Sequence, residues 1–283
     1  MKLTTLDFSK YDRVFVFGCS FTNWYWPTWG DILIHEFNVR NKIGENWAAA
    51  GCGNQYIFNS VMECDNIKKF NERDLVIVQY TDTNREDRYV FDKWVYTHNE
   101  DKKRTVYGDE WVKQFHDDRR AGMIRDYAYI HAIQQLLEYK RCGWNNFSMV
   151  SITRLDPDKV SFFAMQKSLD KRYANLHTLA IKGISESEPW AHSPDVLSVY
   201  KQDLMNIEES FLNIVFHGKW PKVRPMVDKG HPTPKEHLQF LEHVYTDFKL
   251  SDETYKFIEE WEASAWNMTE TPAKYYPPNI ERL

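Results

Sequence analysis

The chain has 283 residues, of which 42% are hydrophobic and 27% charged, a composition typical of a soluble globular protein. Its formal net charge of −5 leaves no basic footprint, so nucleic acid is not an expected partner. No apolar stretch approaches the ~20 residues of a membrane span, so the membrane is not an expected partner either.

The N-terminal residues lack the apolar core of a signal peptide, and the four cysteines show no Cys-x-x-Cys spacing. We therefore expect reduced thiols and a cytoplasmic protein. Assembly into a virus particle is compatible with the same pattern, as is a homo-oligomer. The aromatic content of 16% is high, which suits either core packing or a carbohydrate or partner surface.

Apolar patterns of strand type alternate with patterns of helix type along the chain. This alternation predicts an α/β fold with a parallel sheet covered on both faces. The expected strands cover residues 13–17, 45–50, 74–80 and 147–152, and the expected helices cover 29–37, 55–70, 121–139, 196–216, 235–249 and 252–261.

Residues 87–122 are rich in charge and aromatic side chains and have weak periodicity, which predicts a long insertion or lid. Residues 162–194 give no clear pattern. The prolines at 272, 277 and 278 favour an extended C-terminal arm. We expect one α/β domain over 1–250, followed by a helix and tail over 251–283.

Three side chains supply the parts of a serine nucleophile system. Ser20 follows the first strand, at the edge where open α/β sheets bind ligands. Asp228 and His231 lie three positions apart in a turn-rich segment that Pro232 and Pro234 stiffen. His231 is the expected base for Ser20, with Asp228 orienting its ring.

Acyl transfer also needs donors for the developing oxyanion. The candidates are the backbone amides of Ser20 and Gly51 and the side chain of Asn84. This chemistry requires no metal and no organic cofactor. His231, His237 and His243 are spaced by six, which does not place them on one helical face and argues against a metal site.

Three segments resemble motifs of the SGNH (GDSL-like) hydrolase family. Residues 17–22 (FGCSFT) look like its nucleophile segment, 46–51 (NWAAAG) like the segment whose Gly donates to the oxyanion, and 228–233 (DKGHPT) like its Asp-x-x-His-Pro segment. The resemblance covers roughly 14–80 and 227–244. It implies a three-layer α/β/α flavodoxin-like sandwich and ester hydrolysis through a serine acyl-enzyme, with lipids, acetylated sugars or thioesters as substrates.

The chain departs from the family pattern in two places. Cys19 stands where the family has Asp, and the third segment, Gly-x-Asn-Asp in the family, reads QYTDTNR over 79–85. Ungapped alignment puts Thr83 at the oxyanion position, which makes Thr83 or Thr81 an alternative to Asn84. Two functions follow: an esterase for a small ester, such as an O-acetyl group on a carbohydrate, or an inactive SGNH-fold binding or structural protein, for example a virus-particle component.

Several neighbouring residues have two interpretations. Cys19 is either a buried apolar thiol or, in a shifted register, the nucleophile itself. Trp24 and Trp26 either pack in the core or stack on a sugar ring. Arg85 either belongs to a solvated charge run or binds a substrate carboxylate or sugar hydroxyl. Asn54, in the turn after Gly51, is a further candidate for binding substrate.

Overall fold

A computed structural model describes residues 5–83, 85–90, 93–97, 119–149, 210–216, 225 and 230–268. Its centre is a four-stranded sheet in the order β2-β1-β3-β6, with every neighbouring pair parallel. A parallel bridge from Ser148 to Ser210 continues the sheet beyond β6. This is the strand order of flavodoxin-like sheets. The strands are β1 (Arg13–Phe17), β2 (Ile43–Asn46), β3 (Asp74–Tyr80) and β6 (Gly143–Ser148).

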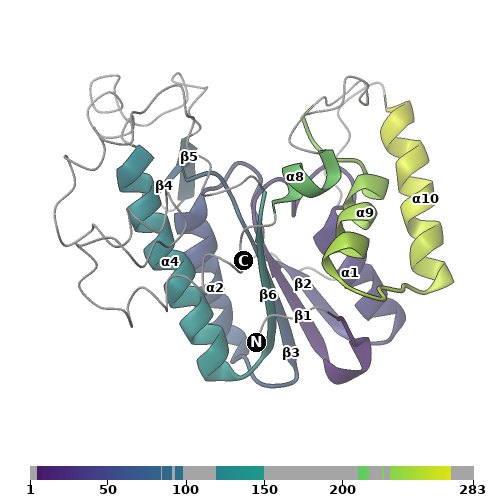
Figure 1. The fold of residues 1–283 in the computed structure, drawn as a ribbon, viewed down its shortest axis with the longest axis horizontal. Helices are drawn as coiled ribbons and strands as arrows, with labels where there is room; N and C mark the ends of the chain where they lie inside the picture. The colour runs from purple at the N-terminus through teal and green to yellow at the C-terminus, as the bar shows by residue number, and fades with distance from the viewer. Residues whose placement is uncertain are drawn as a thin grey trace, which may run out of the picture.

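Helices cover both faces of this sheet, which confirms the expected α/β/α sandwich. Helices α2 and α4 lie on one face, and α1, α8, α9 and α10 lie on the other (Figure 1). No helix in the described part of the chain is long and apolar enough to cross a membrane. The helices are α1 (Trp29–Val39), α2 (Asn54–Lys68), α4 (Arg119–Lys140), α8 (Phe211–Phe216), α9 (Pro234–Val244) and α10 (Asp252–Asn267), with a 3-10 turn η1 at Phe8–Lys10.

The central strands β1 and β3 are apolar on both sides because each is covered by helices above and below. Every residue of β3 is buried, as are the last four of β1. The register pairs Val16 with Asn46 on one side and Phe17 with Val78 on the other. The segments that follow β1, β2 and β3 therefore meet at one edge of the sheet, where ligands bind in folds of this kind.

The fourth strand was predicted at the wrong place. It spans Gly143–Ser148, whereas the apolar pattern indicated 147–152, of which 150–152 lie outside the described residues. The reason is that Asn145 and Asn146 are buried strand residues, and the Asn146 side chain donates to the Tyr80 hydroxyl at 3.2 Å. Polar residues with internal partners hide a buried strand from a hydrophobicity pattern.

The helix and strand ends differ elsewhere by a few residues. An extended piece was expected over 45–50, but strand β2 lies earlier, at Ile43–Asn46, and helix α10 continues to Asn267 rather than ending at 261. Helix α2 ends at Lys68 because Lys69 takes up a left-handed conformation, with φ of 54°. Of the helix expected over 196–216, the structure describes the last turns, as α8.

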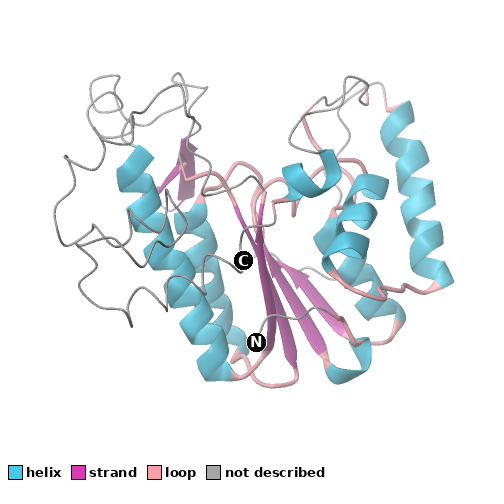
Figure 2. Cartoon of the chain, viewed as in Figure 1, coloured by secondary structure: helices cyan, strands magenta, loops and turns pink. Residues whose placement is uncertain are grey.

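Part of the segment expected to be a long insertion is regular. Strands β4 (Glu86–Val90) and β5 (Lys93–Thr97) form an antiparallel hairpin apart from the central sheet (Figure 2). The Trp94 ring contacts Tyr56 of α2 at a centroid distance of 5.4 Å. Residues 98–118, the unassigned stretch 162–194 and the proline-containing tail after 268 lie outside the described residues.

Candidate active site

Ser20 lies in a tight turn just past the end of β1. The amides of Thr22 and Asn23 both donate to the Cys19 carbonyl, at 2.9 and 3.1 Å, and so close the chain around Ser20. The Ser20 side chain is 5% exposed. It makes no hydrogen bond within the described part of the chain, so its hydroxyl is not committed to a structural contact.

Cys19, the alternative nucleophile, is turned into the core. It is fully buried, and its Sγ lies 3.5 Å from Met149 Sδ. Cys52, beside Gly51, is buried too, and its thiol contacts the Gly18 carbonyl at 3.3 Å. Burial raises the pKa of Cys52 well above the ordinary thiol value. Both thiols therefore pack as small buried side chains next to the turn that holds Ser20.

The structure brings the His231 loop against the Ser20 segment. Trp26 Nε1 donates to the Pro232 carbonyl at 2.7 Å, which joins residues 206 positions apart. The His231 ring stacks on Trp24 at a centroid distance of 3.4 Å and meets Phe21 edge-to-face at 5.7 Å. The imidazole therefore contacts the residue directly after Ser20.

The sequence after His231 explains why its loop is held in place. Thr233 begins helix α9 with a capping box, in which its amide donates to Glu236 Oε2 at 2.6 Å. Pro234 occupies the first helical position, where its missing amide costs nothing. His231 thus precedes a rigid helix start by two residues.

Two features of the predicted triad stay predictions: the hydrogen bond between Ser20 and His231, and the position of Asp228. Ser20 and His231 are not hydrogen-bonded to each other, although catalytic contacts of this kind often tighten only when substrate binds. Asp228 lies outside the described residues, as does Asn84. The structure therefore places Ser20 and His231 at one locus and leaves the carboxylate and the side-chain donor as sequence predictions.

The turn around Gly51 presents a candidate oxyanion donor. Gly51 has φ of 84°, a conformation that a side chain would strain. The turn is tied to the nucleophile segment, because the Ala49 amide donates to the Gly18 carbonyl at 3.2 Å. Within the described residues, neither the Gly51 amide nor the Ser20 amide donates to an acceptor. Both amides are thus available to a ligand.

The two threonines considered in place of Asn84 are buried beside this turn. Thr81 is fully buried and Thr83 is 8% exposed. The Thr81 amide donates to Asn54 Oδ1 at 2.8 Å, while its hydroxyl finds no partner in the described part of the chain. The Thr81 amide is thus already bonded inside the protein, and a role for the Thr81 or Thr83 side chain as an oxyanion donor stays a prediction.

Four residues were candidates for contacting substrate, and the structure gives three of them internal partners. Trp26 is fully buried, Asn54 bonds Thr81 and Asp126, and Arg85 donates from one terminal nitrogen to the Cys52 carbonyl at 2.9 Å. The three therefore have structural contacts inside the protein, and their contact with substrate stays a prediction. Trp24 is half-buried, and His231 covers one face of its indole.

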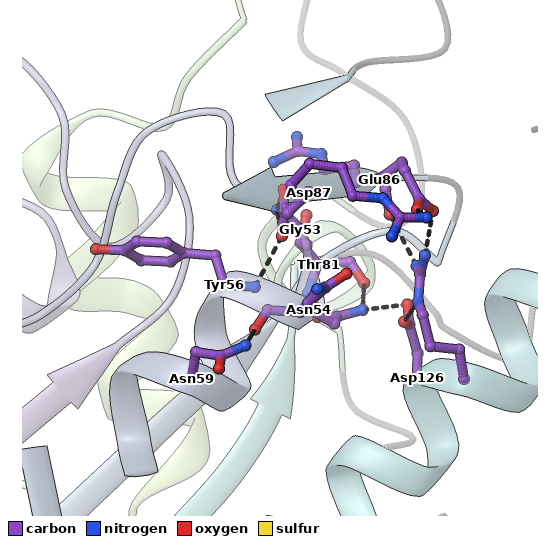
Figure 3. A network of polar contacts seen from close by, with 12 residues as sticks. Gly53, Asn54, Tyr56, Asn59, Thr81, Glu86, Asp87 and Asp126 are labelled. Atoms are coloured by element: carbon purple, nitrogen blue, oxygen red, sulfur yellow. Dashed lines mark hydrogen bonds and ion pairs between the residues drawn. The ribbon is translucent and has the colours of Figure 1, made fainter. Parts of the chain in front are cut away.

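Sequence reasoning missed two buried carboxylates that bond the start of α2, Asp87 and Asp126 (Figure 3). Burial raises the pKa of Asp87 to about 6, although the amides of Tyr56 and Gly53 act to lower it. Burial also raises the pKa of Asp126 to about 7, against the opposing charge of Arg125, whose Nε lies 2.7 Å from Asp126 Oδ1. The charged run at 85–88 had suggested a solvated surface, and no local signal marks Asp87 as buried.

Comparison with known proteins adds little to this geometry. Neither a family model nor a curated protein matches the chain. Five solved chains match, among them the psychrotrophic esterase EstA from Pseudoalteromonas sp., in a form inhibited by monoethylphosphonate. That alignment covers 88% of this chain and 98% of EstA, with 10% identity and a TM-score of 0.39. A likeness this weak supports no argument about the site or its chemistry.

Proposed function

We propose that this chain is a serine hydrolase of the SGNH type that cleaves a small ester through a Ser20 acyl-enzyme. The observation that carries the proposal is the contact between the His231 ring and Phe21, made by a loop that Trp26 anchors to the nucleophile segment. A hydroxyl without an internal partner, an imidazole from a distant loop and two available amides lie at the ligand-binding edge of the sheet.

Each residue has one task in the proposed reaction. Ser20 Oγ attacks the ester carbonyl carbon while His231 accepts the hydroxyl proton. The amides of Ser20 and Gly51 donate to the carbonyl oxygen as it becomes an oxyanion. The intermediate collapses, and the alcohol leaves with the proton from His231. Water then attacks the acyl-enzyme by the same steps, releasing the acid, with Asp228 orienting His231 throughout.

The burial of the nucleophile supports a short acyl group. Ser20 is 5% exposed, and its neighbours Cys19 and Phe21 are buried. A long acyl chain would need more open surface around the attacking oxygen than this turn offers. An acetyl ester suits the site, and an O-acetyl group on a carbohydrate is the substrate that we propose.

The competing hypothesis is an inactive relative that keeps the fold for binding or assembly. The observation in its favour is that no hydrogen bond joins Ser20 to His231. The two hypotheses differ in one measurable property, which is whether Ser20 turns over an ester.

The deciding experiment is hydrolysis of p-nitrophenyl acetate by the wild type, Ser20→Ala and Cys19→Ala, with fluorophosphonate labelling in parallel. The proposal expects turnover and labelling in the wild type and in Cys19→Ala, and the loss of both in Ser20→Ala. Equal background rates and no labelling in all three proteins would reject the esterase. Labelling lost in Cys19→Ala alone would transfer the nucleophile role to the thiol.

A further inference from the structure

Helix α2 begins directly after the turn around Gly51, whose amide is the candidate oxyanion donor. The first amides of this helix are capped by a side chain from another element. Gly53 occupies the N-cap position and has no side chain of its own to bond the free amides of the first turn. Asp87 of β4 fills that role. Its carboxylate accepts from the Gly53 amide at 2.7 Å and from the Tyr56 amide at 2.8 Å (Figure 3).

Two further contacts tie the same stretch to the segment after β3. The Asn54 side chain accepts from the Thr81 amide at 2.8 Å and donates to the Thr81 carbonyl at 3.1 Å. Arg85 donates to the Cys52 carbonyl at 2.9 Å. The three residues that directly follow Gly51 are thus all bonded to residues 81–87.

These contacts suggest what the altered third segment, 79–85, and the first residues of β4 do together in this chain. Asp87, Thr81 and Arg85 hold the backbone on which the Gly51 amide depends. Asp87 is the one of the three whose side chain accepts from two backbone amides of the helix start, and it is fully buried. A carboxylate at a helix N-terminus is also favoured by the helix dipole.

We propose that Asp87 is a positioning residue, whose carboxylate holds the start of α2 so that the Gly51 amide meets the developing oxyanion. This proposal rests on the proposed function. Because the Gly51 contact forms fully only in the transition state, displacing the amide lowers kcat and leaves KM near its wild-type value.

The test is Asp87→Asn, which keeps the volume and one acceptor oxygen but loses the charge. Rates of p-nitrophenyl acetate hydrolysis are divided by the number of sites that fluorophosphonate labels at completion, so that misfolded protein does not count. We expect kcat to fall at least about tenfold, bounded by the ~100- to 1000-fold of losing a whole oxyanion donor.

Gly53→Ala is a second variant that perturbs the same contact with no polar group removed. Gly53 has φ of −102°, which alanine adopts freely, but its methyl would lie 2.9 Å from both Asp87 Oδ2 and Arg85 Cβ. Either the Asp87 carboxylate or the Arg85 segment must shift away from the helix start, and we expect the same fall in kcat at unchanged KM. This variant decides the question if Asp87→Asn does not fold.

Asp74→Asn is the matched control. Asp74 is also fully buried and accepts from Arg13 and from the Asn71 amide, but it opens β3 at the far end of the strand from Thr81. A merely structural role for Asp87 would make all three variants alike, with lower stability and kcat per labelled site within about twofold of wild type. That result overturns the inference and leaves the esterase standing. An unlabelled, inactive wild type would instead reject the proposed function.

Discussion

The hydrogen bond from Trp26 to Pro232 predicts a measurable difference between two buried tryptophans. Trp26 and Trp29 are both fully buried, and replacing either with Phe removes the same indole area. Trp26 Nε1 donates to the Pro232 carbonyl at 2.7 Å, whereas Trp29 Nε1 has no acceptor in the described part of the chain. Trp29→Phe is therefore a matched control for Trp26→Phe.

The size of the difference follows from these two contacts. Trp26→Phe loses a hydrogen bond with a net value of ~0.5–1.5 kcal/mol and strands a buried carbonyl. Trp29→Phe removes a buried donor that has no partner, whose desolvation costs ~1–3 kcal/mol. The area and cavity terms are similar for the two variants. We expect the free energy of unfolding of Trp26→Phe to lie about 2–4 kcal/mol below that of Trp29→Phe.

Urea unfolding of both variants and the wild type measures this difference, with the slope m compared to confirm that the denatured states match. Ester hydrolysis gives a second reading, because loosening the His231 loop should lower kcat in Trp26→Phe. Free energies of unfolding within about 0.5 kcal/mol of each other would refute the argument and show that the Trp26–Pro232 bond does not anchor the loop.

Two buried carboxylates, Asp126 and Glu36, give the remaining predictions. Asp126 has a pKa of about 7 when folded against 3.8 as its ordinary value, so the folded state binds its proton more tightly and stability falls as pH rises from about 4 to 7. Thermal unfolding of Asp126→Asn should lack that part of the pH dependence, at most about 4 kcal/mol, and parallel curves for variant and wild type would contradict it. Glu36 of α1 is fully buried and accepts from the Ser251 amide at 3.0 Å, the Ser251 hydroxyl at 2.8 Å and Arg40 Nε at 2.7 Å. Because Arg40 is partly exposed and regains water, Glu36→Ala should cost about 2–3 kcal/mol and speed amide exchange in α10; unchanged exchange there would show that Glu36 does not hold this helix.

Local sequence patterns predicted the elements that depend on local physics. Strands β1 and β3 are short apolar runs ended by polar or glycine residues, and α1, α2 and α4 carry helical periodicity near their observed ends. Helix α9 begins where expected but ends at Val244 rather than at 249. The alternation of these elements was enough to predict a parallel sheet between two helical layers. It also placed Ser20 and Gly51 after strands whose carboxyl ends share an edge.

Only the tertiary structure decided which polar residues are buried. Asn145 and Asn146 are buried in strand β6, and Asp87, from the charged run after β3, accepts a hydrogen bond at the start of α2. A local pattern cannot reveal such roles, because the partners that satisfy a buried polar group come from distant parts of the chain. Trp24 and Trp26 differ for the same reason. Trp26 donates to the Pro232 carbonyl in the core and Trp24 stacks on His231, and both partners lie more than 200 positions away in the sequence.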